Sequence, residues 1–454
     1  MVAFPPFCLN LFWEGYDAAP WTQFLRHYPG DGAMGRGAEE IYRCREDLKR
    51  FSGRYMAFKR VSEELGRPWF EAWLERLTAN VQGAKIGTRI PVKDRREARA
   101  FLGLWNGAST WNRLTEPYGE GHENQGFLSW RPINVPPGLR RKPEPDPDPS
   151  DLTKKVKQMA LFLGANRVGI AELNRKWVYE ETCRNIYDAG HPQTKRIVFK
   201  EEEPEETETE LIIPESVRYA IVMVIDLNRL LTQVGPASLS TSIATNMAYA
   251  RMGITDIALA EAIRMMGYNA IPCKNSTALS VPLAIDAGLG QLGRNGLLIT
   301  PDYGPAVRIG KVLTDMPLVP DGPVDFGVTE FCETCKKCAE RCPAGAISKG
   351  DRTYEPPSET GNPGALKWYV DGKRCLRYWI ASGASCASCQ AVCPFTKGSF
   401  WGHKVIRGFI KHAPSLNPLW VFLDDLFGYG RMRDPSIMWE LELAPFGIDP
   451  SKEG

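Results

Sequence analysis

The pattern of apolar and polar residues predicts alternating helices and strands through the middle of the chain. Residues 152–173 begin as an amphipathic helix and continue into a short strand. Residues 217–227, VRYAIVMVIDL, form an apolar and β-branched segment of strand length. A long helical pattern covers residues 238–267 and is closed by Gly267 as a C-cap, after which YNAIP at 268–272 is typical of another strand. This alternation favours a layered domain of the α/β or α+β class.

Two stretches interrupt the pattern. Residues 132–150, PINVPPGLRRKPEPDPDPS, are too proline-dense for a helix or a central strand, so they predict an extended connector at a domain boundary. Residues 200–214, KEEEPEETETELIIP, predict a solvated acidic loop without chemistry. Tryptophans are concentrated before the connector, where each one is more simply a core residue, although tryptophans can also line an apolar pocket. They are Trp13, Trp21, Trp69, Trp73, Trp105, Trp111 and Trp130.

Composition narrows the classes of protein further. The 454 residues are 43% hydrophobic and 24% charged, which excludes a largely disordered or fibrous chain. A net charge of +2 argues against a nucleic-acid partner bound through a basic surface. The longest apolar run, Tyr219 to Ile225, is too short to cross a bilayer. The first residues show no export signal, so we expect either a cytosolic protein or a trimmed form of an exported one.

The cysteines carry the strongest chemical signal, because eight of the twelve lie between positions 332 and 393. FCETCKKCAERCP has the C-x2-C-x2-C-x3-C-P spacing of bacterial ferredoxins. A second run, CASCQAVCP, has its first partner cysteine eleven residues upstream, which departs from that spacing. In two-cluster ferredoxins the cysteine before the proline serves the other cluster. We therefore predict two [4Fe-4S] clusters, one held by Cys332, Cys335, Cys338 and Cys393 and the other by Cys342, Cys375, Cys386 and Cys389.

A pair of structural zinc sites is the alternative for these cysteines, because paired C-x-x-C units also bind zinc. The additional cysteine in the first run and the proline after each run weigh against zinc. Cysteines elsewhere lack such spacing, and we interpret them as buried small residues. They are Cys8, Cys44, Cys183 and Cys273.

A glycine-rich segment lies between the predicted core and the cysteine runs. Gly288, Gly290 and Gly293 have the G-x-G-x-x-G spacing of a dinucleotide site. A dinucleotide fingerprint follows a strand and opens a helix, whereas this segment follows a helical pattern and runs into the strand-like LLIT. The glycines more plainly allow close approach of the backbone to a bulky ligand.

Taken together, four segments resemble the corrinoid-dependent reductive dehalogenases. They are AYARM, MGYNAIPCKN, AGLGQLGRNGLLITPDYGPAVRIGKVLTD and VTEFCETCKKCAERCP, and the resemblance is strong from Ser216 to Pro394. It implies a corrinoid-binding core similar to the nitroreductase fold, joined to a ferredoxin-like two-cluster module. We expect an N-terminal aromatic-rich region with its connector capping the active site at 1–150, the core at 151–328, the module at 329–400, and an extension packing on the core at 401–454.

The resemblance also implies residues for the replacement of a carbon-bound halogen by hydrogen. Tyr249 matches the family's proton donor, Arg308 its basic partner, and Asn275 the asparagine that helps to hold the tyrosine and the halogen. A tyrosine keeps its proton at neutral pH, and a nearby cation stabilises the phenolate that remains after transfer. Thr245, one helical turn before Tyr249, and Trp379 are expected to line the substrate pocket. Residues expected to contact the corrinoid are Gly288, Gly290, Gly293 and Gly296.

The corrinoid is expected to be cobalamin-type and base-off. Some corrinoid proteins ligate cobalt through a D-x-H-x-x-G motif, and no histidine of this chain lies in one. The tryptophan-rich region favours a small chlorinated alkane or alkene over a bulky phenol as substrate. The five histidines are His27, His122, His191, His403 and His412.

By resemblance, the native partners are a small membrane-anchor protein and an upstream electron donor at the outer face of the cytoplasmic membrane. A homodimer is left open. Two other functions compete: an epoxyqueuosine reductase, which shares the cobalamin core and paired clusters but acts on a tRNA base, and a ferredoxin-type electron carrier. The near-neutral charge and long aromatic region argue against the first. About 330 residues before the first cysteine run are more than a carrier needs.

Overall fold

A four-stranded sheet of order β3-β8-β12-β9 lies at the centre of the computed structural model. Side chains of the inner strand β8 alternate between two apolar clusters, with Val222 and Val224 on one face and Ile221 and Met223 on the other. Both faces are buried, so the apolar run of this strand is continuous. Every pairing is antiparallel, which decides for α+β over α/β. The strands are β3 (Arg167–Glu172), β8 (Tyr219–Asp226), β12 (Val307–Thr314) and β9 (Ala270–Pro272).

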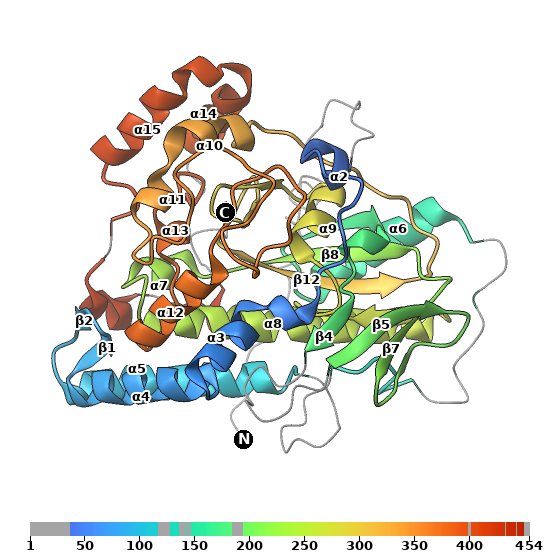
Figure 1. Cartoon of the computed structure of the whole chain (residues 1–454), viewed down its shortest axis with the longest axis horizontal. Helices are drawn as coiled ribbons and strands as arrows, with labels where there is room; N and C mark the ends of the chain where they lie inside the picture. Colours follow the sequence, from blue (N-terminus) through green and yellow to red (C-terminus); the bar gives the residue numbers. More distant parts are fainter. Residues whose placement is uncertain are drawn as a thin grey trace, which may run out of the picture. The chain divides into compact units, whose positions relative to one another are not determined.

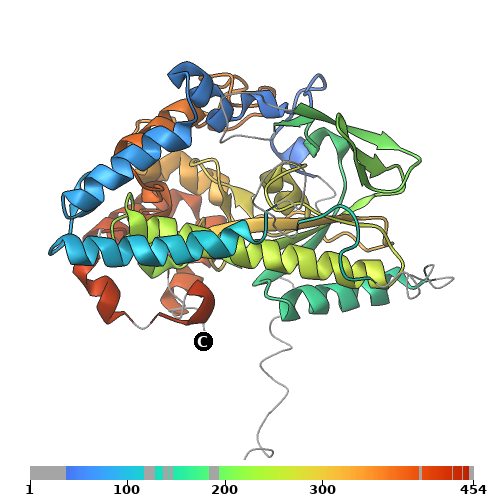
Figure 2. The same cartoon turned by 90° about the horizontal axis from the view of Figure 1, so that it is seen from below.

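Helices cover both faces of this sheet (Figure 1). Helices α6 (Pro149–Phe162) and α8 (Leu239–Met265) pack on one face, and α9 (Ser280–Asp286) packs on the other. Figure 2 shows α5 (Arg95–Arg113) running alongside α8. Gly267, at φ 94°, closes α8 as predicted, because glycine adopts this left-handed conformation without strain. The predicted helix and strand at 152–173, the strand at 217–227 and the strand at 268–272 are likewise confirmed.

The structure describes residues 37–116, 128–135, 143, 147–183, 194–397, 401–431, 433–441 and 443–448. All of them fall in one unit, Gly35–Gly454. No helix in these ranges is long and apolar enough to cross a membrane. The boundaries predicted at 150, 328 and 400 stay predictions.

The predicted connector at 132–150 is wrong at its end. Helix α6 begins at Pro149, and the Asp148 side chain accepts a hydrogen bond from the Ser150 amide. Aspartate is a favoured N-cap and proline a favoured first helical residue, so the dense prolines conceal a helix start. Residues 136–142 and 144–146 lie outside the described ranges.

The predicted acidic loop at 200–214 is wrong in part, because the segment contains the end of one strand at Lys200, the short strand Glu205–Glu206 and a longer strand after it. Glu210–Pro214 forms strand β7, which pairs in parallel with β5, and its Leu211 and Ile213 are buried. The short apolar stretch determines the structure here, because burying two large side chains outweighs the polarity of the preceding residues. This second sheet consists of β4 (Glu181–Cys183), β5 (Thr194–Lys200), β7 and β6 (Glu205–Glu206).

The N-terminal helices pack on the first half of α8. Trp69 and Trp73 are buried there beside Leu239 and Ile243, so their interpretation as core residues is confirmed. Trp111 is exposed, and Trp13 and Trp21 lie outside the described residues. The remaining elements are α2 (Ala38–Ile41), η1 (Gly53–Tyr55), α3 (Ala57–Leu65), α4 (Trp69–Gln82), β1 (Lys85–Gly87), β2 (Ile90–Pro91), η3 (Arg175–Trp177), α7 (Arg229–Gln233), β10 (Gln291–Leu292), β11 (Leu298–Ile299), α10 (Val328–Cys335), α11 (Lys337–Glu340), α12 (Gly372–Ser382), α13 (Ser388–Ala391), α14 (Trp401–His412), η4 (Pro414–Leu416), α15 (Asn417–Leu426), η5 (Pro435–Glu440) and η6 (Pro445–Gly447).

Candidate functional site

Tyr249 lies in the middle of α8, with its ring half-buried against the apolar cluster on one face of the central sheet. Its hydroxyl oxygen accepts a hydrogen bond of 2.6 Å from Nδ2 of Asn275, which lies in the loop after β9. Asn275 is exposed, so this pair is at a boundary between the core and solvent. Two of the residues predicted to be catalytic are therefore in direct contact.

Arg308 reaches the same tyrosine from β12. Its guanidinium carbon lies 4.8 Å from the centroid of the Tyr249 ring, within the range of a cation–π interaction. An Nη2 hydrogen bond of 3.4 Å joins Arg308 to the hydroxyl of Thr245. The Nε of Arg308 is buried without a hydrogen-bond partner among the described residues. A buried donor of this kind usually meets a ligand or an ordered water, so the guanidinium has capacity left for a bound group.

The loop that carries Asn275 is held in an unfavourable backbone conformation. Lys274 and Thr277 both have positive φ, 44° and 72°, although neither is a glycine. Such residues persist only where the surroundings over-determine the conformation. Here the backbone amide of Lys274 donates to Oδ2 of Asp256 on α8 at 2.9 Å. The side chain of Lys274 extends away to the end of α5, where it donates to Asn112, Thr115 and Glu116.

A buried carboxyl and a buried amine lie beneath this loop, and the backbone amide of Lys311 donates to Oδ2 of Asp256 at 3.2 Å. Burial raises the pKa of the Asp256 carboxyl to about 7, against the opposing charge of Lys311. Burial also lowers the pKa of the Lys311 ammonium, which donates to the Lys274 carbonyl at 2.6 Å and to the Ser280 hydroxyl at 2.9 Å. Sequence reasoning missed these residues. The available signal was a charged residue inside an apolar element, as in RIGKVLT of β12 and ITDIALA of α8.

Trp379, expected to line the substrate pocket, lies on α12. It packs against the apolar cluster that contains Ala248 and is bordered by Met247, the two residues before Tyr249. Its ring lies 6.3 Å from that of Phe58, and its indole N–H is buried without a described hydrogen-bond partner. Helix α12 also carries Cys375, one of the cluster cysteines. The indole N–H of Trp379 is thus a second buried donor without a described partner, after Nε of Arg308.

The predicted corrinoid glycines have close neighbours within the chain itself. A Cβ on Gly288 would collide with the carbonyl of Gly322, and one on Gly290 with the carbonyl of Ile299. Gly288 and Gly296 also have positive φ, 71° and 72°. Contact with a corrinoid is not needed to explain these glycines and stays a prediction. Gly293 lies elsewhere, in the wall of the cavity described next.

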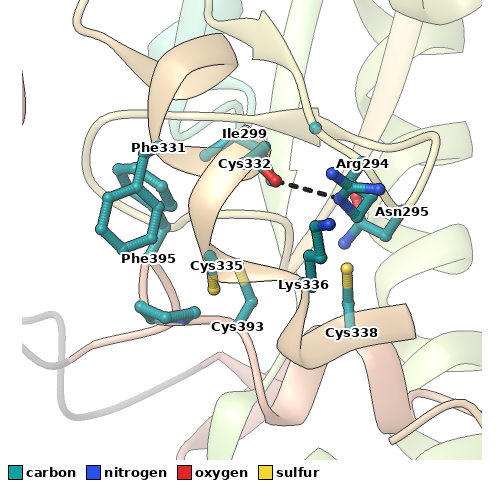
Figure 3. A pocket seen from close by; sticks show the side chains of 12 residues that line it. Arg294, Asn295, Ile299, Phe331, Cys332, Cys335, Lys336, Cys338, Cys393 and Phe395 are labelled. Carbon is teal, nitrogen blue, oxygen red and sulfur yellow. Dashed lines mark hydrogen bonds between the residues drawn. The ribbon is translucent and has the colours of Figure 1, made fainter. Parts of the chain in front are cut away.

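Four cysteines surround one cavity at the start of α10. They are Cys332, Cys335, Cys338 and Cys393, the four assigned to the first cluster. Figure 3 shows Phe331 and Phe395 on one side of this space and Arg294 and Asn295 on the other. The four residues come from two sequence motifs, with Cys393 lying 55 residues after Cys338, as the crossed ligand assignment requires.

The other four cysteines also lie near one another. Burial raises the pKa of the Cys375 thiol to about 12, and the charges of Cys386 and Cys342 act in the same direction. Burial first, and then Cys386, Cys375, Cys338 and Cys342, raise the pKa of Cys389. The interaction between Cys389 and Cys338 indicates that the two groups are neighbours.

Burial also favours the protonated form of the thiols in the first group of cysteines when no iron is bound. Burial raises the pKa of Cys332, Cys335 and Cys338 to about 12. A bound metal centre would make four thiolates favourable in this partly buried setting, because it supplies the compensating positive charge. Of the cysteines outside the runs, Cys273 is buried as expected and Cys44 is half-buried. Cys8 and the Cys183 side chain lie outside the described residues.

Comparison with known proteins agrees with this geometry. Residues 331–396 match the family described as 4Fe-4S double cluster binding domain. The chain is 42% identical over 397 residues to a tetrachloroethene reductive dehalogenase of Sulfurospirillum multivorans, covering 84% of this chain and 78% of the relative. It is 36% identical over 337 residues to a tetrachloroethene reductive dehalogenase of Desulfitobacterium hafniense, covering 68% of this chain and 60% of the relative.

A solved structure gives the same result for the fold. It belongs to a reductive dehalogenase and is described as suggesting a mechanism for B12-dependent dehalogenation. The TM-score is 0.59 at 22% identity, and the match covers 90% of this chain and 50% of that one. At this identity the likeness shows the fold alone, and the chain spans about half the length of that protein.

Proposed function

The chain belongs to the reductive dehalogenase family, and we propose that it replaces a chlorine of a small chlorinated ethene by hydrogen. Two electrons and one proton are consumed and one chloride is released: R–Cl + 2e⁻ + H⁺ gives R–H + Cl⁻. The observation that carries the proposal is the convergence of Asn275 and Arg308 on Tyr249. The substrate class rests on the relatives, which are named for tetrachloroethene.

In this proposal Tyr249 donates the proton from its hydroxyl oxygen. The Asn275 amide holds that oxygen at 2.6 Å, which restricts the direction of the O–H bond. After transfer, the guanidinium of Arg308 stabilises the phenolate, because the positive charge lies beside the ring in a partly desolvated setting. Thr245 keeps Arg308 in position through its hydroxyl. Proton transfer by a positioned side chain is worth about 10² to 10⁴ in rate.

The cysteine groups would hold two [4Fe-4S] clusters, which deliver the electrons. The match to the double-cluster family supports this, as does the cavity that four cysteines line. A bound corrinoid would supply the cobalt centre at which the carbon–halogen bond is reductively cleaved. The unpartnered donors of Arg308 and Trp379 suit a polar group bound near this region. We propose the base-off form, since the sequence lacks the D-x-H-x-x-G motif.

Three further features belong to the same proposal. Residues 151–328 would form a corrinoid-binding core of the nitroreductase type, under a cap contributed by residues 1–150. The native enzyme would work at the outer face of the cytoplasmic membrane. Its partners there would be a small membrane-anchor protein and an upstream electron donor.

The test is a reconstitution with iron, sulfide and cobalamin under anaerobic conditions. We expect one cobalt and about eight iron atoms per chain, from two four-iron clusters. With reduced methyl viologen and tetrachloroethene, one chloride should appear for every two viologens oxidised. Zinc in place of iron would contradict the cluster assignment.

Assays with two further substrates distinguish the competing functions. A chlorophenol tests the preference for a small apolar substrate, and a tRNA bearing epoxyqueuosine tests the alternative activity. Reduction of the tRNA base without chloride release from any organohalide, in protein loaded with all cofactors, would overturn the proposed function.

A further inference from the structure

Arg294 is a buried cation in the wall of the first cysteine cavity. It follows Gly293 in the loop between β10 and β11, and its side chain is only 2% exposed. Its guanidinium donates three hydrogen bonds of 2.9 Å, and every acceptor is a backbone carbonyl. The acceptors are Cys332, Ser348 and Gly350. Figure 3 shows the bond to Cys332 beside the cavity.

The three bonds join two segments of the cluster module to the core. Cys332 is in the first turns of α10, and residues 348–350 follow the last cysteine of the first run. A guanidinium stays charged under all ordinary conditions, so the hydrogen bonds fix a full positive charge at this wall. Carbonyl oxygens solvate that charge but do not cancel it.

Two neighbouring cations are compensated, whereas Arg294 and the half-buried Lys336 of the same cavity wall form no ion pair among the described residues. Lys337, between two cluster cysteines, forms ion pairs with Asp424 and Asp425 of α15, and Lys397 forms an ion pair with Asp424. Among the described residues, no carboxylate forms an ion pair with Arg294. The exposed Asp351 carboxylate acts on the Arg294 charge without pairing with it, so this charge still reaches the cavity, in a setting where screening by water is weak.

Two arginines lie beside the ring of Trp368, and they can be compared with each other. The guanidinium carbon of Arg294 lies 4.3 Å from the centroid of the Trp368 ring, and that of Arg352 lies 5.8 Å from it. Arg352 differs in two respects: its side chain is 27% exposed, and it pairs with Glu333 at 3.2 Å. Two arginines beside one ring thus differ in burial and in charge compensation.

We propose that Arg294 raises the reduction potential of the [4Fe-4S] cluster bound by Cys332, Cys335, Cys338 and Cys393. With four thiolate ligands the oxidised cluster carries a total charge of 2−, and one electron from an external donor takes it to 3− without breaking a bond. A fixed cation at the cavity wall stabilises the 3− state more than the 2− state. The proposal rests on the cluster content of the proposed function, but not on the identity of the organohalide.

The test is a redox titration followed by electron paramagnetic resonance. Arg294→Gln and Arg294→Met remove the charge, Arg294→Lys keeps it, and Arg352→Gln is the matched control. In both neutral variants we expect the equilibrium constant for reduction of one cluster to fall about tenfold, which is about 59 mV for one electron. Arg294→Lys should retain most of the wild-type potential, and Arg352→Gln should be unchanged. Repeating the titration with Cys386→Ser, which removes a ligand of the other cluster, assigns the shifted signal.

Two outcomes overturn the proposal. A change of less than about twofold in a neutral variant that holds both clusters would show that the charge does not set the potential. If both neutral variants fail to bind the first cluster while Arg294→Lys binds it, the residue is needed for assembly instead. Wild-type protein that holds both clusters but releases no chloride would remove the proposed function, and the titration would still decide the role of Arg294.

Discussion

Replacing Tyr249 with phenylalanine removes one hydroxyl and leaves the ring in place. The ring packs on the apolar cluster of the central sheet and lies beside the Arg308 guanidinium, and neither contact needs the oxygen. The single hydrogen bond described for the hydroxyl comes from Asn275, which is exposed and can turn to water. We therefore expect the variant to fold and to bind both kinds of cofactor.

The expected loss of folding stability is much smaller than the expected loss of turnover. One hydrogen bond at a partly exposed position is worth about 0.5 to 1.5 kcal/mol of folding free energy. Loss of a general acid lowers turnover by about 10² to 10⁴, or about 3 to 5 kcal/mol of activation free energy. If Tyr249 donates the proton, the loss of turnover must therefore exceed anything that the loss of stability explains.

Chloride release with reduced viologen measures the turnover, and thermal unfolding measures the stability. Tyr268→Phe is the matched control, because Tyr268 borders the same apolar cluster and loses the same hydroxyl. The control should keep most of its turnover. A Tyr249→Phe enzyme with full cofactor content and turnover within about threefold of wild type, far short of the loss expected for a general acid, would refute the role of Tyr249 as proton donor.

Three further predictions follow from buried and charged contacts. In Gly310→Ala the new Cβ would collide with the buried Oδ1 of Asp256. The free energy of unfolding, measured by denaturant titration, should therefore fall by about 1 to 3 kcal/mol. An unchanged value would contradict the close packing of α8 on β12. Lys274→Met removes the side-chain hydrogen bonds to the end of α5 that help to hold the Asn275 loop. Turnover should therefore fall while the iron and cobalt contents stay constant. Unchanged turnover would show that the loop is held without these hydrogen bonds. The backbone amide of Glu359 and two basic side chains lower the pKa of its carboxyl from 4.5 to about 2, so its stabilisation is present above pH 4.5 and lost as the pH falls towards 2. Glu359→Gln should therefore be less stable than wild type at pH 7 by at most about 1 kcal/mol, with the difference vanishing in acid, and a difference that persists at pH 2 would contradict this origin.

Local patterns predicted the elements well, because their geometry is fixed within a few residues, and the four cysteines assigned to the first cluster line one cavity. The helix at 238–267 needs only its composition and Gly267, and three cysteines on one tight turn meet at one cavity whatever surrounds them. Thr245 and Tyr249 share a helix face for the same local reason. The contact between Tyr249 and Asn275 was expected only through the family resemblance, since no local rule brings α8 and the loop after β9 together.

Buried charges could not be predicted in this way. Lys311 and Asp256 lie in apolar elements, and only the packing of α8 on β12 shows that they are partners. Arg294 is similar: its segment suggested a dinucleotide or corrinoid site, whereas its side chain joins the core to the cluster module. Sequence spacing reveals a ligand set that is local. A buried charge whose hydrogen-bond partners lie in a distant segment cannot be told from a surface charge in the sequence.

These cations lie where segments distant in the sequence meet, which bears on the predicted boundaries at 328 and 400. Arg294 crosses the first of them with three hydrogen bonds to the module, and Lys337 crosses the second through its ion pairs with α15. Cutting the chain at either boundary would leave a buried charge without its partners, which costs several kcal/mol and exceeds the stability that a small module can spare. We therefore expect residues 329–400 to assemble their clusters only with the core and the C-terminal extension in place. A module expressed alone that binds about eight iron atoms and unfolds cooperatively would contradict this reasoning.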